Sequence, residues 1–359
     1  MRQYRFPVVA VTVLLAVLAF AACEPTEPLP EPADSIVPDS GTALILNEGS
    51  WGGNNASLSR LDLAAGELEN GWFAAVNGRG LGDLAQDLVL YGGKAYVTVS
   101  ESGSLEAIDT ATGIATHVDL GTRYPRHIAA EGGKLYITCY SPRSVIRIDT
   151  ATLLVEASCP LGGYNPEGIA AVGGKLLVAS SNISGNQGTY SYDNRLYVVD
   201  IAAFSVDTTV VVGSNPQKVM PLDGTRAIVN YVGDYGSQPA GSAIVDVNTL
   251  AVTQTGLELT NMTVGDGAVY GYCTEWTADY SGKTTSYYSI DAATLAVTPL
   301  LPDVGLNAYA IARHPVSGNI YIATDGDYIA NGDLVCFAPD GSRRWKREVG
   351  MLPSKIVFW

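Results

Sequence analysis

One short pattern recurs along the chain and constrains its fold more than any other feature. It consists of an apolar run rich in β-branched residues, an aspartate that opens a tight turn, and a second apolar run. Aspartate suits such a turn because its carboxylate can accept hydrogen bonds from nearby backbone N–H groups. The pattern occurs seven times, 40 to 51 residues apart, with turns at Asp62, Asp109, Asp149, Asp200, Asp246, Asp291 and Asp340.

A second phrase alternates with the first. Glycine turns such as "YGGKAYVTV" and "EGGKLYITC" each open a strand, and a further apolar segment such as "YPRHIAA" precedes each of them. One period therefore holds four strands, which we label A to D. A period of about 40–50 residues with four strands is typical of a β-propeller.

The two ends of the chain indicate how the ring closes. The first repeat opens with a B-like strand, "TALILN", and the chain finishes with an A-like strand, "LPSKIVFW". Pairing these two strands leaves no open sheet edge. We therefore predict an all-β, seven-bladed β-propeller over residues 41–359, with four antiparallel strands per blade and the C-terminal strand completing the N-terminal blade.

The N-terminus has the features of an export signal. Two arginines precede an apolar run that is too short to span a membrane, and the run ends in "FAAC" at Cys23. We predict a lipoprotein signal peptide over residues 1–22, lipidation of Cys23, and a Pro/Glu-rich tether over residues 23–40. Ordinary secretion, with Cys23 incidental, is the alternative. The formal net charge of −15 disfavours nucleic acid as a partner.

Few residues suit catalysis or metal binding. The chain contains no H-x-H, H-E-x-x-H or G-x-S-x-G motif, and its four remaining cysteines lie in or beside apolar runs, as buried thiols do. The loop "DGDYIANGD" lacks two of the ligand positions of a calcium loop. We expect no catalytic residue, metal or cofactor. Several carboxylates could still lie on the propeller face that carries the functional loops, namely Glu48, Asp83, Glu167, Glu275 and Asp327.

Aromatic and amide residues concentrate in the loops of one face. The A–B and C–D turns are uniformly short, whereas the B–C connections vary in length and carry Tyr, Trp and Asn. Such residues combine apolar area with hydrogen-bonding tips, so we predict a ligand site there, although ordinary solvated loops are the alternative. The predicted ligand-binding residues are Trp51, Asn54, Tyr124, Tyr164, Asn165, Tyr192, Tyr235, Trp276, Tyr280, Tyr309 and Tyr328.

The chain also resembles a known family over residues 43–359. The phrases "LNEGSWGGNNASL", "NPEGIAAVGGKLLVA", "AIARHPVSGNIYIATDGDY" and "CFAPDGSRRWK" are similar to those of YncE-like propeller lipoproteins that capture vitamin B12 (cobalamin). The resemblance implies binding of cobalamin or a related corrinoid and delivery to a TonB-dependent outer-membrane transporter. It also implies an outer-membrane protein that faces the cell exterior through its lipid anchor.

Three other functions remain open from the sequence. The propeller could capture a different nutrient, such as a glycan, haem or a metal chelate. It could be an enzyme, with a lactonase or lyase the most plausible, or a structural or adhesive surface protein. A requirement for a metal together with turnover would favour the enzyme.

Overall fold

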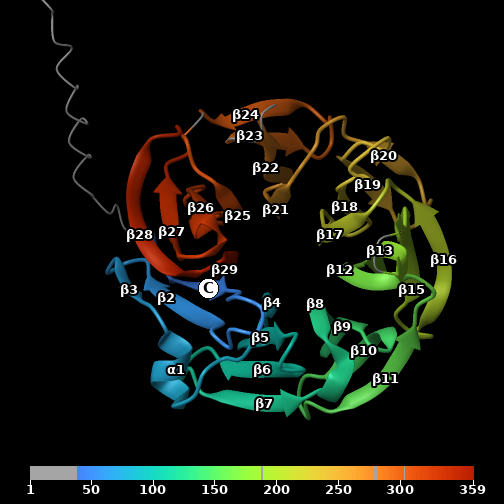
Figure 1. The fold of residues 1–359 in the computed structure, drawn as a ribbon, viewed down its shortest axis with the longest axis horizontal. Helices are drawn as coiled ribbons and strands as arrows, with labels where there is room; N and C mark the ends of the chain where they lie inside the picture. The colour runs from blue at the N-terminus through green and yellow to red at the C-terminus, as the bar shows by residue number, and fades with distance from the viewer. Residues whose placement is uncertain (1–38, 187–188, 278–281, 303) are drawn as a thin grey trace, which may run out of the picture. The chain divides into compact units, whose positions relative to one another are not determined.

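The computed structural model describes residues 39–359, apart from 187–188, 278–281 and 303. In this part of the chain the strands form seven antiparallel sheets arranged around a ring, which confirms the predicted seven-bladed β-propeller (Figure 1). We number the blades 1 to 7 in chain order. Within each blade, strands A to D follow one another from the innermost to the outermost position.

Blade 1 joins the last strand of the chain to the first three, and the other blades follow in sequence. Blades 1 and 2 contain β29 (Pro353–Phe358), β1 (Thr42–Asn47), β2 (Ser57–Asp62) and β3 (Glu67–Glu69), then β4 (Ala85–Tyr91), β5 (Lys94–Val99), β6 (Ser104–Asp109) and β7 (Ala115–Asp119). Blades 3 and 4 contain β8 (Pro125–Glu131), β9 (Lys134–Tyr140), β10 (Arg143–Asp149) and β11 (Val155–Pro160), then β12 (Tyr164–Val172), β13 (Lys175–Asn186), β15 (Arg195–Asp200) and β16 (Ser205–Val211). Blade 5 contains β17 (Pro216–Pro221), β18 (Arg226–Tyr231), β19 (Gly241–Asp246) and β20 (Val252–Gln254). Blades 6 and 7 contain β21 (Asn261–Gly265), β22 (Ala268–Trp276), β23 (Lys283–Asp291) and β24 (Val297–Leu301), then β25 (Ala308–Arg313), β26 (Ile320–Thr324), β27 (Asn331–Phe337) and β28 (Arg343–Met351).

A few short elements complete the described chain. Strand β14 (Thr189–Tyr192) pairs with β13 as an extra strand of blade 4. The helix α1 (Trp72–Asn77) follows β3, and the single 3-10 turns η1 (Gly121–Arg123) and η2 (Gly326–Tyr328) lie in connections. Among the described residues, no helix has the length and apolar character needed to span a membrane.

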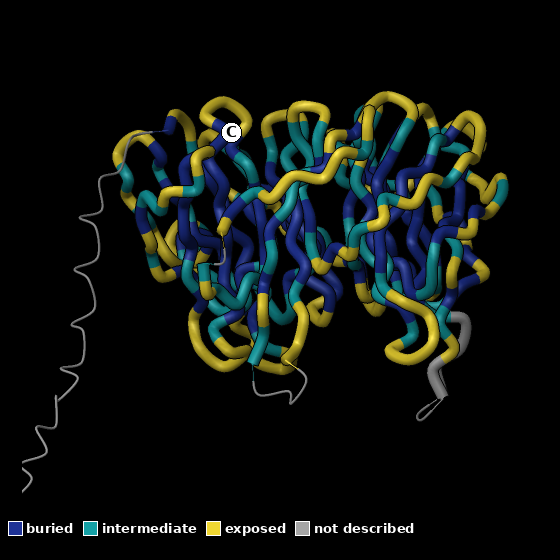
Figure 2. Tube along the Cα trace, turned by 90° about the horizontal axis from the view of Figure 1, so that it is seen from above, coloured by how far each residue is buried: buried dark blue, intermediate teal, exposed yellow. Residues whose placement is uncertain are grey.

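The core lies between the blades. Successive side chains of a strand point to opposite faces, and both faces of the inner strands are covered by neighbouring blades. In β13, Leu176 and Val178 pack toward Val145 of blade 3, whereas Leu177 packs toward Val229 of blade 5. This two-sided burial explains why the B and C strands are almost continuously apolar, and why only their ends are exposed (Figure 2).

The ring closes as predicted. Strand β29 pairs with β1 in antiparallel register, so that Ala43 lies opposite Phe358. The backbone of Thr42 exchanges two hydrogen bonds with that of Trp359, with N···O distances of 2.8 and 2.9 Å. Strand β1 is therefore paired on both sides, with β29 and with β2.

The repeated aspartates hold the C–D turns. In the turn after β19, the Asp246 carboxylate accepts hydrogen bonds from the backbone N–H groups of Asn248 and Thr249, both at 2.9 Å, and from the Thr249 hydroxyl at 3.0 Å. These bonds, the Thr249 N–H first, lower the pKa of Asp246. The C–D turns lie on the same face as the A–B turns, so the B–C and D–A connections form the opposite face.

The cysteine prediction is confirmed for the described chain. The thiols of Cys139, Cys159, Cys273 and Cys336 are free and buried. Burial raises the pKa of Cys139, Cys273 and Cys336 to about 12, so these thiols are protonated at neutral pH.

Candidate functional site

The innermost strands share a local feature that directs polar side chains toward the ring axis. Four of them contain, at or near their start, proline, two variable residues and an aliphatic residue, at positions 125–128, 166–169, 216–219 and 353–356. The register with strand B shifts within each of these segments, which is a β-bulge: across both variable residues in β8, β12 and β17, and between Pro353 and Lys355 in β29. A bulge changes the direction of the side chains it contains. The same shift occurs in β4 and β25, which begin with alanine instead.

Side chains from these bulges line a cavity of about 470 Å³ at the centre of the ring. The cavity reaches the face of the B–C connections, since Trp276 and Lys283, at the end of β22 and the start of β23, line it. In the described chain, every blade except blade 4 contributes to the lining. Its uncharged hydrogen-bonding side chains include Gln86, Gln217, Asn230, Thr260, Asn261 and Thr274.

An aromatic wall from blades 6 and 7 forms one side of the cavity. The Trp276 and Tyr328 side chains are more than half exposed, which is unusual for large aromatic residues. The Lys283 ammonium lies 5.0 Å from the Trp276 ring centroid and 5.1 Å from that of Tyr328. It also pairs with the Asp325 carboxylate at 3.1 Å. Cation–π contacts and this ion pair fix the orientation of both rings at the mouth.

A hydrogen-bonded chain continues from this wall into blades 1 and 2. The Tyr309 ring packs edge-on against Tyr328, and its hydroxyl donates to the Glu48 carboxylate at 2.5 Å. The other Glu48 oxygen accepts a hydrogen bond from the Gln86 amide at 2.6 Å. Burial, together with the negative charge of Glu48, raises the pKa of Tyr309, so its hydroxyl remains a donor at neutral pH.

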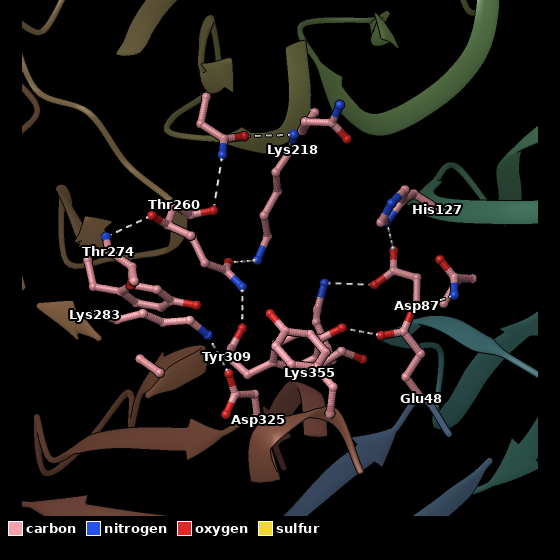
Figure 3. Close-up of a pocket in the computed structure, with 18 of the residues that line it drawn as sticks. Glu48, Asp87, His127, Lys218, Thr260, Thr274, Lys283, Tyr309, Asp325 and Lys355 are labelled. Atoms are coloured by element: carbon pink, nitrogen blue, oxygen red, sulfur yellow. Dashed lines mark hydrogen bonds and ion pairs between the residues drawn. The ribbon is translucent and has the colours of Figure 1, made fainter. Parts of the chain in front are cut away.

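Charged groups close the base of the cavity. The Lys355 ammonium pairs with the buried Asp87 carboxylate at 2.8 Å, and His127 lies 3.6 Å from the same carboxylate (Figure 3). Burial would raise the pKa of Asp87, but the charges of Lys355 and His127 outweigh it and hold the pKa below its usual range. Lys218 approaches the same region and donates to the Asn261 side chain at 2.7 Å.

Asp87, His127, Lys218 and Lys355 also line a second cavity of about 280 Å³, on the side of the A–B turns. That cavity is bounded mainly by the innermost strands as far as Tyr91, at the A–B turn of blade 2. The group formed by Asp87, His127, Lys218 and Lys355, which we call the charged belt, therefore separates the two halves of the central channel.

The structure brings together only part of the predicted site. Trp276, Tyr309 and Tyr328 line the cavity. Tyr192 and Tyr235 contact one another edge-to-face, with ring centroids 6.0 Å apart, and Tyr192 borders a separate hollow between blades 4 and 5. Tyr280 lies outside the described residues.

The other predicted residues lie on the same face but do not line the cavity. Trp51 is an exposed loop residue, and Asn54 follows it with a φ of 49°. Tyr124 and Asn165 have φ values of 50° and 52° immediately before Pro125 and Pro166, so they shape the entrance to the bulges of β8 and β12. The Arg143 guanidinium covers the Tyr164 ring, with its carbon 3.2 Å from the centroid.

Most of the lining was not predicted, including Asp87, Lys218, Asn261 and Lys355. The repeated proline motif would have indicated Lys218 and Lys355, because its two variable residues are polar in most copies, for example "PRHI", "PQKV" and "PSKI". Of the carboxylates considered from the sequence, Glu48 lines the cavity, and Glu167 is buried beside Arg126. Among the described residues, no three His, Cys, Asp or Glu side chains are grouped so that they could hold a metal ion.

Comparisons with known proteins give the fold and no family. No family model matches the chain, and no curated protein matches it. A protein of unknown function from Desulfotomaculum acetoxidans is 14% identical with a TM-score of 0.63, over 89% of this chain and 99% of the other. A quinoprotein alcohol dehydrogenase-like protein from Bacteroides thetaiotaomicron is 15% identical with a TM-score of 0.62, over 89% and 78%. A protein from Lactobacillus plantarum is 16% identical with a TM-score of 0.59, over 89% and 99%. At these identities the likeness shows the propeller fold alone.

Proposed function

We propose that this propeller captures cobalamin or a related corrinoid in the central cavity and passes it to a TonB-dependent outer-membrane transporter. The observation that carries the proposal is the lining itself: amide and hydroxyl side chains from five blades beneath two exposed aromatic rings. A corrinoid has a broad apolar ring system with amide groups around its edge. The ring edge would contact Trp276 and Tyr328, and its amides would meet the polar lining.

The rigidity of the scaffold supports tight binding. Each lining residue except Tyr328, which lies in η2, belongs to a strand or is directly next to one in the chain. Side chains fixed in this way lose little conformational freedom when a ligand binds, so many modest contacts can add up to high affinity. Sequence resemblance to the cobalamin-capture lipoproteins supports the same ligand.

In this proposal the protein binds its ligand without converting it. The lining hydroxyl of Tyr309 has a raised pKa, and Asp87 is held by Lys355, so both groups are already engaged with protein partners. Delivery to the transporter and the lipid anchor at Cys23 form part of the proposal, and Cys23 lies outside the described residues.

Titration calorimetry with cyanocobalamin tests the proposal. We expect saturable one-to-one binding to the purified propeller. Haemin and a mixed oligosaccharide set serve as comparison ligands, because they represent the alternative nutrients. Absence of cyanocobalamin binding, or tighter binding of a comparison ligand, would refute capture of a corrinoid.

A further inference from the structure

The base of the cavity carries a positive charge without a close acidic partner. Three ammonium groups line the cavity, and two of them are paired: Lys283 with Asp325 at 3.1 Å and Lys355 with Asp87 at 2.8 Å. Within the described part of the chain, Lys218 has no carboxylate within ion-pair distance. Its bonded partner is the neutral amide oxygen of Asn261.

Lys218 and Lys355 approach the base from different sides of the ring. Lys218 extends from the bulge of β17 and Lys355 from that of β29, and both ammonium groups point into the centre of the cavity (Figure 3). Burial lowers the pKa of Lys218 to about 7, and the positive charge of Lys355 adds to this effect while Asp87 opposes it. A bound anion would relieve this cost, because it would supply the missing counter-charge in a region shielded from water.

The surrounding lining offers a further hydrogen-bond donor to an anion. Gln217 lies beside Lys218 in the same bulge, and its side-chain amide uses one N–H group in a bond to Asn215 at 2.5 Å, which leaves the second N–H group for a ligand. The chain as a whole carries a formal charge of −15. Positive charge at the bottom of the cavity therefore contrasts with the negative charge of the rest of the molecule. Such a site favours a ligand group that carries a localised negative charge.

We propose that Lys218 and Lys355 form a phosphodiester subsite at the base of the cavity, which holds the phosphate of the nucleotide loop of cobalamin. The inference rests on the proposed capture of a corrinoid and extends it, because it predicts which corrinoids are preferred. Complete corrinoids carry the phosphodiester, whereas cobinamide has the same macrocycle without the nucleotide and its phosphate. The macrocycle then lies toward Trp276 and Tyr328, and the nucleotide loop enters the cavity first.

Calorimetry with two ligands tests this subsite. The wild-type protein should bind cyanocobalamin about tenfold or more tightly than dicyanocobinamide in phosphate-free buffer, since a charge-assisted hydrogen bond is worth roughly that much. Lys218→Met should reduce this preference toward one, and Lys218→Arg, which keeps the charge, should retain most of it. Lys283→Met is the matched control. It removes a cavity lysine from the aromatic wall, and it should lower the affinity for both ligands by a similar factor.

The outcomes separate the two proposals. Equal wild-type affinity for both ligands, or a preference that survives in Lys218→Met, would overturn the subsite and leave corrinoid capture standing. Failure of both ligands to bind the wild-type protein would overturn corrinoid capture together with the subsite. Lys218→Met removes a poorly compensated charge and is expected to fold, and its melting curve is recorded beside each titration.

Discussion

At the scale of single residues, Trp276 and Tyr328 are the side chains on which ligand binding should depend most. Both rings are exposed at the mouth and are fixed by Lys283. Removing a central aromatic anchor typically costs about 2 kcal/mol or more, which is roughly 30-fold in affinity. We expect Trp276→Ala and Tyr328→Ala each to weaken cyanocobalamin binding to this extent in calorimetry. Tyr91→Ala, at the far end of the channel, should stay within about twofold of wild type; the reverse pattern would mean that the ligand face is wrongly assigned.

Lys218 should also leave a signature in the pH dependence of stability. Its pKa is about 7 in the folded protein, against roughly 10.4 in an unfolded chain. The unfolded chain therefore binds more protons between these values, so the contribution of Lys218 to stability rises with pH across that window and is at its lowest below pH 7. Lys218→Met should raise Tm by about 2 °C or more at pH 6, and the gain should shrink toward pH 10. A gain that is constant from pH 6 to pH 10 would contradict a half-buried Lys218 with a lowered pKa.

At the scale of the elements, the C–D turns depend on their aspartates. The Asp246 carboxylate has a lowered pKa, so its contribution to stability is present above the unfolded pKa near 3.9 and is lost as pH falls through the folded value. We expect Asp246→Ala to lower Tm by about 2–4 °C at pH 7 in a thermal scan, and to make little difference at pH 2. Glu67→Ala, an exposed carboxylate in β3, is the control and should change Tm at neither pH. An equal loss for both variants would mean that the turn bonds do not stabilise the fold.

The closing strand is the element on which the ring depends. Deleting residues 352–359 removes β29 and exposes the whole edge of β1, so we expect an insoluble protein or a large fall in Tm. Ile356→Ala provides a milder test, because Ile356 packs between blades 1 and 7. It should cost about 2–4 kcal/mol in the free energy of unfolding, measured by denaturant titration. A truncated chain that melts like the parent would refute closure by this strand.

At the scale of the whole molecule, the proposed lipid anchor at Cys23 would determine where the propeller works. We predict that the full chain incorporates labelled fatty acid at Cys23 and fractionates with outer membranes. Cys23→Ala should abolish the label and release the protein from the membrane fraction, since the proposed anchor is attached to that one thiol. Equal labelling of both forms would remove the lipoprotein assignment and leave the cavity and its proposed ligand unaffected.

The sequence by itself determined the architecture. Each blade repeats the same short sequence features, namely an aspartate turn, a glycine turn and apolar strands. These features depend on interactions between residues that are close together in the chain. Seven copies and two complementary end strands therefore predicted the blade count and the closure. The same reasoning found Trp276 and Tyr328, because long aromatic-rich B–C insertions are visible in the sequence, and it found Tyr309 from its place in a D–A connection on the same face.

Only the tertiary structure decided what forms the base of the cavity. Lys355 and Asp87 are 268 positions apart, and they meet because the ring brings the last strand beside the first blades. Asp87, Lys218 and Lys355 each occupy a bulge at the start of an innermost strand, where a shift in register turns polar side chains toward the axis. The direction in which a side chain points from a bulge depends on how its strand pairs with strand B. The meeting of these side chains at the ring axis depends on closure of all seven blades. Neither is encoded in any single repeat, so the charged belt emerges only when the ring is complete.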